Sequence, residues 1–97
     1  MKSIFLVFNQ VLSADVIQLL DDLEIRGFTR WTSVHGRGSE TGEPRMGSHT
    51  WPELNDAMLC VVEDRLVPAV LERVRELDAK APEQGLRAFV WNVEQVF

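Results

Sequence analysis

The sequence has no tyrosine, a single cysteine and no long hydrophobic run. Cys60 has no second cysteine to pair with, so an internal disulfide and a disulfide-stapled scaffold are excluded. The apolar run of residues 4–8 is too short for the apolar region of a signal peptide and for a membrane span. We therefore expect no membrane-spanning segment and a location in the cytoplasm.

Basic residues are also scarce relative to acidic ones. Ten lysines and arginines stand against fifteen aspartates and glutamates, which gives a formal net charge of −5 over 97 residues. A nucleic-acid-binding domain needs a basic face that neutralises phosphates. The composition therefore argues against nucleic acid as a partner, and we expect the three tryptophans and five phenylalanines in the core or at a subunit interface.

The hydrophobic pattern along the chain predicts six elements in the order strand, helix, strand, strand, helix, strand. Strands are expected where β-branched and aromatic residues cluster, and helices where apolar residues recur every three or four positions. The first helix is expected to begin with Ser13 as its N-cap and to end at Gly27, and the second to begin at Asp64. The expected strands are residues 3–9, 28–35, 57–62 and 86–93.

This order is typical of a single α+β domain, residues 1–97, with the ferredoxin-like βαββαβ fold. We expect a four-stranded antiparallel sheet of strand order 4-1-3-2 with two helices on one face. The first and third strands are apolar on both faces, because residues 4–8 and 57–62 are all apolar. Two helices cover only one face of the sheet, so the other face needs a further cover. We therefore expect a homo-oligomer.

A long loop is expected from residue 36 to residue 56, because the periodicity of hydrophobic residues stops there. The segment holds four of the six glycines and two of the four prolines. Glycine-rich backbone with few apolar anchors loses much conformational entropy when it becomes ordered. Loops of this length in small domains are commonly functional or disordered. We therefore expect the loop 36–56 to be flexible in the absence of a ligand.

Several short stretches resemble the P-II nitrogen-regulatory proteins and their P-II-like relatives. They are the run Ile25–Thr29, the glycines Gly36 and Gly38 at the start of the loop, and Gly85 just before the last strand. The resemblance implies a homotrimer that binds a small effector, in the classical branch ATP or ADP, in clefts between neighbouring subunits. It also implies that the loop 36–56 corresponds to the T-loop of that family, through which a partner protein is contacted.

The same resemblance implies which residues bind the ligand. Thr29, Gly36 and Gly38 match positions on the adenosine side of the nucleotide, and Arg87 stands where the family has a phosphate-contacting lysine. By its own composition, the turn that follows the second strand is also able to form an anion-binding nest of backbone N–H groups with help from its arginine. The expected ligand-binding residues are Thr29, Gly36, Arg37, Gly38, Gly85 and Arg87. The expected ligand is a small anionic effector, with ATP, ADP or another nucleotide as candidates.

The leading hypothesis is therefore a P-II-like signalling protein without catalytic activity or a metal site. The segment 48–55 leaves an alternative open, because it is the densest cluster of reactive side-chain types in the chain. In this alternative the chain is a small oligomeric ferredoxin-like enzyme that uses His49 as a base and Glu53 as the group that orients it. His49 with His35 and Cys60 is a soft-metal set, although no standard zinc spacing is present. A pocket that joins His49 and Glu53 would favour this alternative.

Overall fold

The computed structural model describes all residues of the chain, 1–97, and confirms the predicted order of elements. Short 3₁₀ turns precede both helices and the last strand. The helices and strands are β1 Lys2–Asn9, α1 Ser13–Asp22, β2 Thr29–Val34, β3 Asn55–Val62, α2 Val67–Lys80 and β4 Arg87–Asn92. The turns are η1 Gln10–Leu12, η2 Asp64–Leu66 and η3 Pro82–Gln84. Neither helix is long and apolar enough to cross a membrane.

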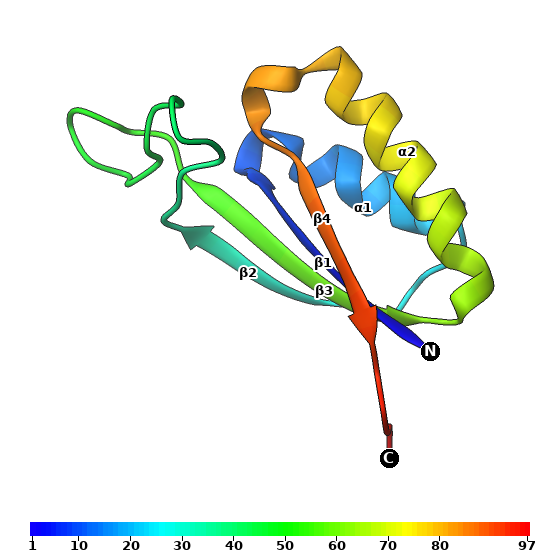
Figure 1. Cartoon of the computed structure of the whole chain (residues 1–97). Coiled ribbons are helices and arrows are strands. Elements are labelled where there is room, and N and C mark those ends of the chain that lie inside the picture. The colour runs from blue at the N-terminus through cyan, green and yellow to red at the C-terminus, as the bar shows by residue number, and fades with distance from the viewer.

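The four strands form one antiparallel sheet in the order β2-β3-β1-β4. This is the predicted order 4-1-3-2, counted from the other edge. Both helices lie on one side of the sheet, and the loop between β2 and β3 projects from the end of the sheet at which β4 begins (Figure 1). The predicted ferredoxin-like α+β fold is confirmed.

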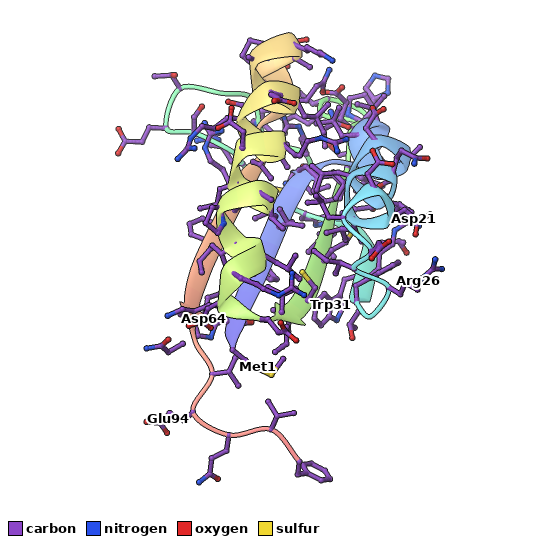
Figure 2. All side chains as sticks on the ribbon, turned by 90° about the vertical axis from the view of Figure 1, so that its right-hand side faces the viewer. Met1, Asp21, Arg26, Trp31, Asp64 and Glu94 are labelled. Atoms are coloured by element: carbon purple, nitrogen blue, oxygen red, sulfur yellow. The ribbon has the colours of Figure 1, made fainter.

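The core lies between the sheet and the helices, where side chains fill the layer between the ribbons (Figure 2). Side chains alternate between the two faces of a strand, and in β1 Ile4, Leu6 and Phe8 are fully buried on the helix side. The two helices contribute the buried residues Val16, Leu19, Leu20, Val70 and Val74. Burial of each such side chain contributes about 1.5–3 kcal/mol, which makes this layer the main source of stability.

The opposite face of the sheet carries large apolar side chains with no second layer on them, and we call it the open face. Phe5 of β1 lies opposite Leu59 of β3 and Phe89 of β4, so these three residues share the open face. Trp31 packs edge-on against Phe5, with 6.4 Å between the ring centroids. Phe89 is 53% and Trp91 49% exposed. The prediction that the two central strands are apolar on both faces is confirmed.

The first helix ends earlier than predicted, and Gly27 does not close it. Glu24 takes the left-handed position, with φ of 60°. Its N–H donates to the carbonyl of Asp21 at 2.9 Å, and the N–H of Ile25 donates to the carbonyl of Leu20 at 2.8 Å. This is the hydrogen-bond pattern of a Schellman C-cap. The prediction was wrong because the burial of Ile25 in the core, and not the position of the nearest glycine, decides where the helix ends. Glu24 adopts the left-handed conformation that places Ile25 there.

The second helix begins later than predicted. Asp64 opens the turn η2, and α2 begins at Val67 with Pro68 in its first turn, where a missing N–H is tolerated. The Asp64 carboxylate does not cap the helix, because it pairs at 3.0 Å with the N-terminal ammonium of Met1. The predicted start was therefore wrong by one 3₁₀ turn, since a charged donor is a stronger partner for a carboxylate than a backbone N–H.

The third strand begins two residues earlier than predicted, so Asn55 and Asp56, the last two residues of the expected loop, belong to β3. We keep the name loop 36–56 for the connection that ends at this strand. Asp56 is a buried carboxylate that is 1% exposed. It accepts hydrogen bonds from the Ser13 hydroxyl, from Nη2 of Arg30 at 2.9 Å and from the backbone N–H of Ser33 at 2.9 Å. The side chain therefore joins the start of α1, the strand β2 and the start of β3.

These contacts also correct the predicted role of Ser13, which does not cap α1 with its side chain. Ser33 has a φ of 58° at the point where the pairing of β2 with β3 shifts register, and its N–H is directed at Asp56. Burial raises the pKa of the Asp56 carboxyl, but the hydrogen bonds from Ser13, Ser33 and Arg30 outweigh it. They hold the pKa below its usual value. The ionised carboxylate is therefore part of the folded structure.

Replacing Asp56 by Asn is expected to lower the free energy of unfolding by about 2–3 kcal/mol, because three donors lose a charged acceptor. Folding lowers the pKa of Asp56, so its stabilisation is fully present above the unfolded-state pKa of about 4 and is lost as the pH falls through the folded-state value. Urea unfolding at several pH values below neutrality measures both effects.

Wild type should lose stability more steeply than Asp56→Asn in the acidic range. Asp21→Asn, a change at an exposed position of α1, is the matched control and should change the free energy of unfolding by less than about 0.5 kcal/mol. The same acid dependence in wild type and Asp56→Asn would show that Asp56 contributes nothing through its charge.

Candidate functional site

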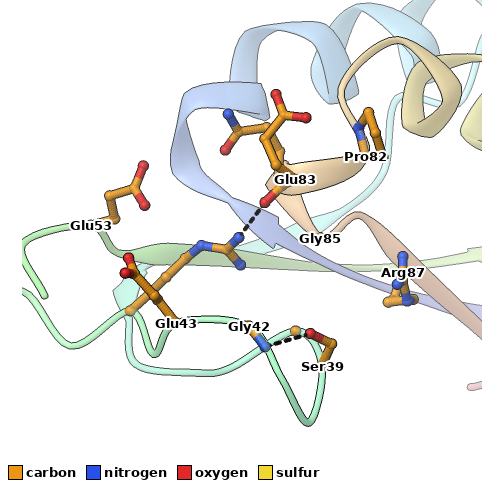
Figure 3. A pocket seen from close by; sticks show the side chains of 11 residues that line it. Ser39, Gly42, Glu43, Glu53, Pro82, Glu83, Gly85 and Arg87 are labelled. Carbon is orange, nitrogen blue, oxygen red and sulfur yellow. Dashed lines mark hydrogen bonds between the residues drawn. The ribbon is translucent and has the colours of Figure 1, made fainter.

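A polar pocket of about 350 Å³ lies where the loop 36–56 meets the start of β4 (Figure 3). The loop forms one wall, and the turn η3 with the first residue of β4 forms the other. No hydrophobic residue lines the pocket, a composition that favours a charged or strongly polar ligand. The lining residues are Gly38, Ser39, Gly42, Glu43, Arg45, Glu53, Pro82, Glu83, Gln84, Gly85 and Arg87.

Arg45 is the buried arginine of this pocket, with 7% of the residue exposed. Its backbone forms an antiparallel bridge with Gly36, with N···O distances of 2.9 and 2.6 Å. Its Nη1 donates to Oδ1 of Asn55 at 3.2 Å, and its Nη2 donates to the carbonyl of Glu83 at 2.8 Å, the contact drawn in Figure 3. Arg45 therefore connects the base of the loop with β3 and η3.

Glycines allow the two walls to approach one another. A Cβ atom on Gly38 would lie 3.5 Å from Cα of Gly85, and one on Gly85 would lie 3.0 Å from Nη1 of Arg45. Gly85 also has a φ of 66°, in the left-handed region where other residues are strained. At the base of the loop, a Cβ on Gly36 would meet Nδ2 of Asn55 at 2.6 Å. A Cβ at Gly36 or Gly85 would therefore require the neighbouring side chain to move, whereas at Gly38 it would make an ordinary contact.

Arg87 lies at the edge of the pocket and is held by its own chain. Its Nη1 donates to the carbonyl of Leu86 at 2.7 Å and lies 3.6 Å from Oδ1 of Asp78 on α2. That carboxylate oxygen is buried and accepts no hydrogen bond. The Arg87 side chain is 49% exposed, and turning toward a ligand would break both its hydrogen bond to the Leu86 carbonyl and its ion pair with Asp78.

Three of the six predicted ligand-binding residues, Gly38, Gly85 and Arg87, line this one pocket. Gly36 does not line it but forms the base of the loop beside it, through its bridge to Arg45. The structure therefore places residues from both ends of the predicted site, the start of the loop and the start of the last strand, around the same space.

The other two predicted residues lie elsewhere in the chain. Arg37 is exposed and does not line the pocket. Thr29 begins β2, pairs with Leu59 on the open face, and lies at the end of β2 that is remote from the loop. Sequence reasoning missed Arg45, which is the second arginine of the loop. The only available signal was its place in a glycine-rich segment, because its partners come from distant parts of the chain.

The pocket does not join His49 to Glu53, so the structure does not favour the enzyme or metal alternative. His49 is exposed and lies outside the pocket, and Oε1 of Glu53 accepts a hydrogen bond from Nδ2 of Asn9 at 3.0 Å. No group of three or more His, Cys, Asp and Glu side chains lies together as metal ligands would. Burial raises the pKa of the Cys60 thiol, which therefore stays protonated and unreactive.

A protein-family model gives a direct test of the predicted resemblance. The model described as "Nitrogen regulatory protein P-II" matches residues 1–97, the whole of the chain. The chain belongs to the P-II family. The resemblance stated from the sequence is confirmed, and the chain is a regulatory protein of the P-II type. No curated protein matches the sequence.

Solved structures of P-II-like proteins share the fold of this P-II chain. CPII from Thiomonas intermedia K12, a nitrogen regulatory PII-like protein bound to ADP, AMP and bicarbonate, superposes with a TM-score of 0.78 at 18% identity, covering 95% of this chain and 84% of CPII. The apo form of CPII superposes with a TM-score of 0.72 at 16% identity. The alignment covers 95% of this chain and 87% of CPII. A putative PII-like signalling protein from Thermus thermophilus superposes with a TM-score of 0.69 at 22% identity. The alignment covers 95% of this chain and 85% of that protein. At such low identity these comparisons show the fold.

Gly85→Ala is expected to lower the free energy of unfolding by about 1–2 kcal/mol, because alanine is strained at this left-handed φ and its Cβ would crowd Arg45. Gly27→Ala is the matched control: no atom lies within 4 Å of the position of its Cβ and its φ is not left-handed. Urea unfolding of both variants checks the difference. Equal decreases in the free energy of unfolding for Gly85→Ala and Gly27→Ala would show that the close approach at Gly85 does not contribute to stability.

Proposed function

We propose that this P-II protein is a signalling regulator without catalytic activity, which binds a small anionic effector in the pocket at the base of the loop 36–56. One observation carries the proposal: Gly38 and Gly85 face one another beside two arginines, Arg45 and Arg87. Guanidinium groups bind carboxylate or phosphate through parallel hydrogen bonds, and a backbone N–H such as that of Gly38 binds oxyanions, whereas the N–H of Gly85 donates to the carbonyl of Pro82 at 3.4 Å. The absence of apolar lining supports a polar ligand.

A nucleotide is the proposed effector, with bicarbonate as the smaller candidate. Glu43, Glu53 and Glu83 place hydrogen-bond acceptors around the same pocket, so a ligand that has N–H or O–H donors as well as an anionic group fits it better than a bare anion. Nucleotides have both kinds of group. The relative CPII supports this choice, because its structures contain ADP, AMP and bicarbonate.

The proposed assembly is a homotrimer in which the pocket opens into a cleft between subunits. Trp31, Phe89 and Trp91 are exposed on the open face, where a second copy of the chain would bury them. Thr29 shares this face but lies at the far end of β2 from Arg87. Thr29 therefore meets an effector only if a neighbouring subunit brings it there, which is the reason to place the site between subunits.

The loop 36–56 is the proposed docking element for a partner protein. It projects beyond the sheet (Figure 1) and exposes the apolar side chains of Met46 and Trp51. Within it, the N–H of Gly47 donates to the carbonyl of Glu53 at 3.1 Å and the N–H of Ser48 to that of Trp51 at 2.9 Å. The domain 1–97 then consists of a rigid body and a flexible loop whose arrangement depends on the effector.

Arg87→Ala is expected to weaken the binding of ADP by about 1.5–3 kcal/mol, the contribution of a hydrogen bond to a charged group. His49→Ala is expected to leave the affinity unchanged, because His49 is exposed and lies outside the pocket. Isothermal titration calorimetry of the wild type and both variants gives the affinities. If His49→Ala abolishes ADP binding and Arg87→Ala leaves it intact, the effector binds at the distal part of the loop and not in this pocket.

The wild type is expected to have about three times the chain mass of 11.1 kDa in light scattering, because the open face is buried between copies. Phe89→Asp should shift the protein toward monomers, since a carboxylate would be buried among apolar side chains. Val11→Asp is the matched control, a similarly exposed apolar position on the turn η1 and away from the open face. A monomeric wild type at micromolar concentration would contradict the assembly.

A further inference from the structure

Asp78 provides the one carboxylate within 4.0 Å of the Arg87 guanidinium, and its position in α2 is locally unfavourable. It belongs to the last turn of this helix, which ends at Lys80. The C-terminal end of a helix carries partial negative charge, so a carboxylate is disfavoured there. Oδ1 of Asp78 is also buried without a hydrogen-bond donor, which lowers the stability of a folded chain. Local stability therefore does not explain this aspartate.

Arg87 is the only charged partner of Asp78, and the contact between them is loose. Oδ1 of Asp78 lies 3.6 Å from Nη1 of Arg87, beyond the range of about 2.7–3.2 Å of an ordinary N–H···O hydrogen bond. That Nη1 atom donates instead to the carbonyl of Leu86 at 2.7 Å. Asp78 therefore attracts the guanidinium through its charge, without the directional bond of a strong ion pair.

The two contacts hold the Arg87 side chain against its own strand and α2. Arg87 forms no hydrogen bond with another residue that lines the pocket, and none is drawn to it in Figure 3. Leu86 is 2% exposed, so the carbonyl that accepts from Arg87 belongs to a buried residue. The side chains of Arg87 and Asp78 are 49% and 36% exposed, so the pair itself is open to solvent and to dissolved ions.

We propose that Asp78 is a positioning residue that competes with the effector for the Arg87 guanidinium and thereby sets the effector concentration at which the protein responds. The inference rests on the proposed function and adds a regulating residue outside the pocket, since Asp78 does not line it. In the free protein, the carboxylate holds Arg87 against α2. In the bound protein, an oxyanion of the effector takes the place of the carboxylate, and Asp78 loses its only charged partner.

This competition predicts that removal of the carboxylate tightens effector binding. Asp78→Asn removes the charge and keeps the shape of the side chain. Wild type and variant, as full chains, are titrated separately with ADP, AMP and bicarbonate by calorimetry. Each ligand that the wild type binds should bind Asp78→Asn about two- to fivefold more tightly, the range expected for the loss of a partly exposed ion pair.

Glu72→Gln is the matched control for the change in charge. Glu72 is an exposed residue of the same helix, lies outside the pocket and pairs with Arg75 at 3.4 Å. The variant removes an equal charge from α2 without touching Arg87. Its affinity for each ligand should equal that of the wild type.

A double variant tests whether Asp78 acts through Arg87. In the Arg87→Ala background, Asp78→Asn should leave the affinity unchanged, because the guanidinium for which the carboxylate competes is absent. A general decrease of negative charge near the pocket would instead tighten binding by the same factor in both backgrounds. That result would overturn the role of Asp78 as a competitor for Arg87.

Thermal unfolding separates competition from a structural role. Removal of a carboxylate from the last turn of α2 should leave the Tm of Asp78→Asn equal to that of the wild type or raise it. An Asp78 that only stabilises the fold would instead lower the Tm of the variant and leave the affinity of the folded protein intact. Asp78→Ser also removes the carboxylate and replaces Asp78→Asn in the titrations if that variant folds poorly.

The outcomes also distinguish this inference from the proposed function. Unchanged or weaker binding in both Asp78→Asn and Asp78→Ser would overturn the role of Asp78 and leave the proposed function standing. If neither the wild type nor Asp78→Asn binds ADP, AMP or bicarbonate, both the inference and the proposed function are wrong.

Discussion

The end of the sheet at which the pocket lies depends on one buried carboxylate. Asp56 accepts hydrogen bonds from the start of α1, from β2 and from the shifted register at Ser33. A buried charge is costly unless it is both paired and fully hydrogen-bonded, so the donors Ser13, Arg30 and Ser33 must all be in place together. Their common acceptor lies at the register shift between β2 and β3, where Ser33 donates to it.

The strand β3 connects Asp56 to the pocket, because Asn55, the residue next to it in β3, contacts a pocket residue. Side chains alternate along a strand, so Asp56 faces the helices while its neighbour Asn55 contacts the base of the loop. There Asn55 accepts a hydrogen bond from Arg45 and packs against Gly36. Through adjacent residues, the interaction that stabilises the fold also orients the pocket arginine. The pocket combines two arginines with three glutamates, so this chain of net charge −5 offers an anion two local guanidinium groups and not a positive surface.

Much of the fold was predictable from the sequence, because it depends on local patterns. Hydrophobic periodicity predicted the six elements and their order, and the apolar runs 4–8 and 57–62 predicted central strands with two apolar faces. The glycines and the short motifs around them predicted the P-II family and three residues of the pocket, Gly38, Gly85 and Arg87. Helix ends were predicted less well, since the burial of a residue such as Ile25 decides them and not the nearest glycine.

The amino-acid sequence by itself therefore determined the order of elements, the family and the segments that meet at the site, all of which follow from the residue types in short windows. The tertiary structure alone decided that the polar residues Asn55 and Asp56 belong to a strand and that Arg45, not Arg37, is the buried arginine of the loop. The physical reason is the same in each case. A polar side chain is buried only where distant parts of the chain supply its partners, and Glu83 reaches Arg45 only after folding.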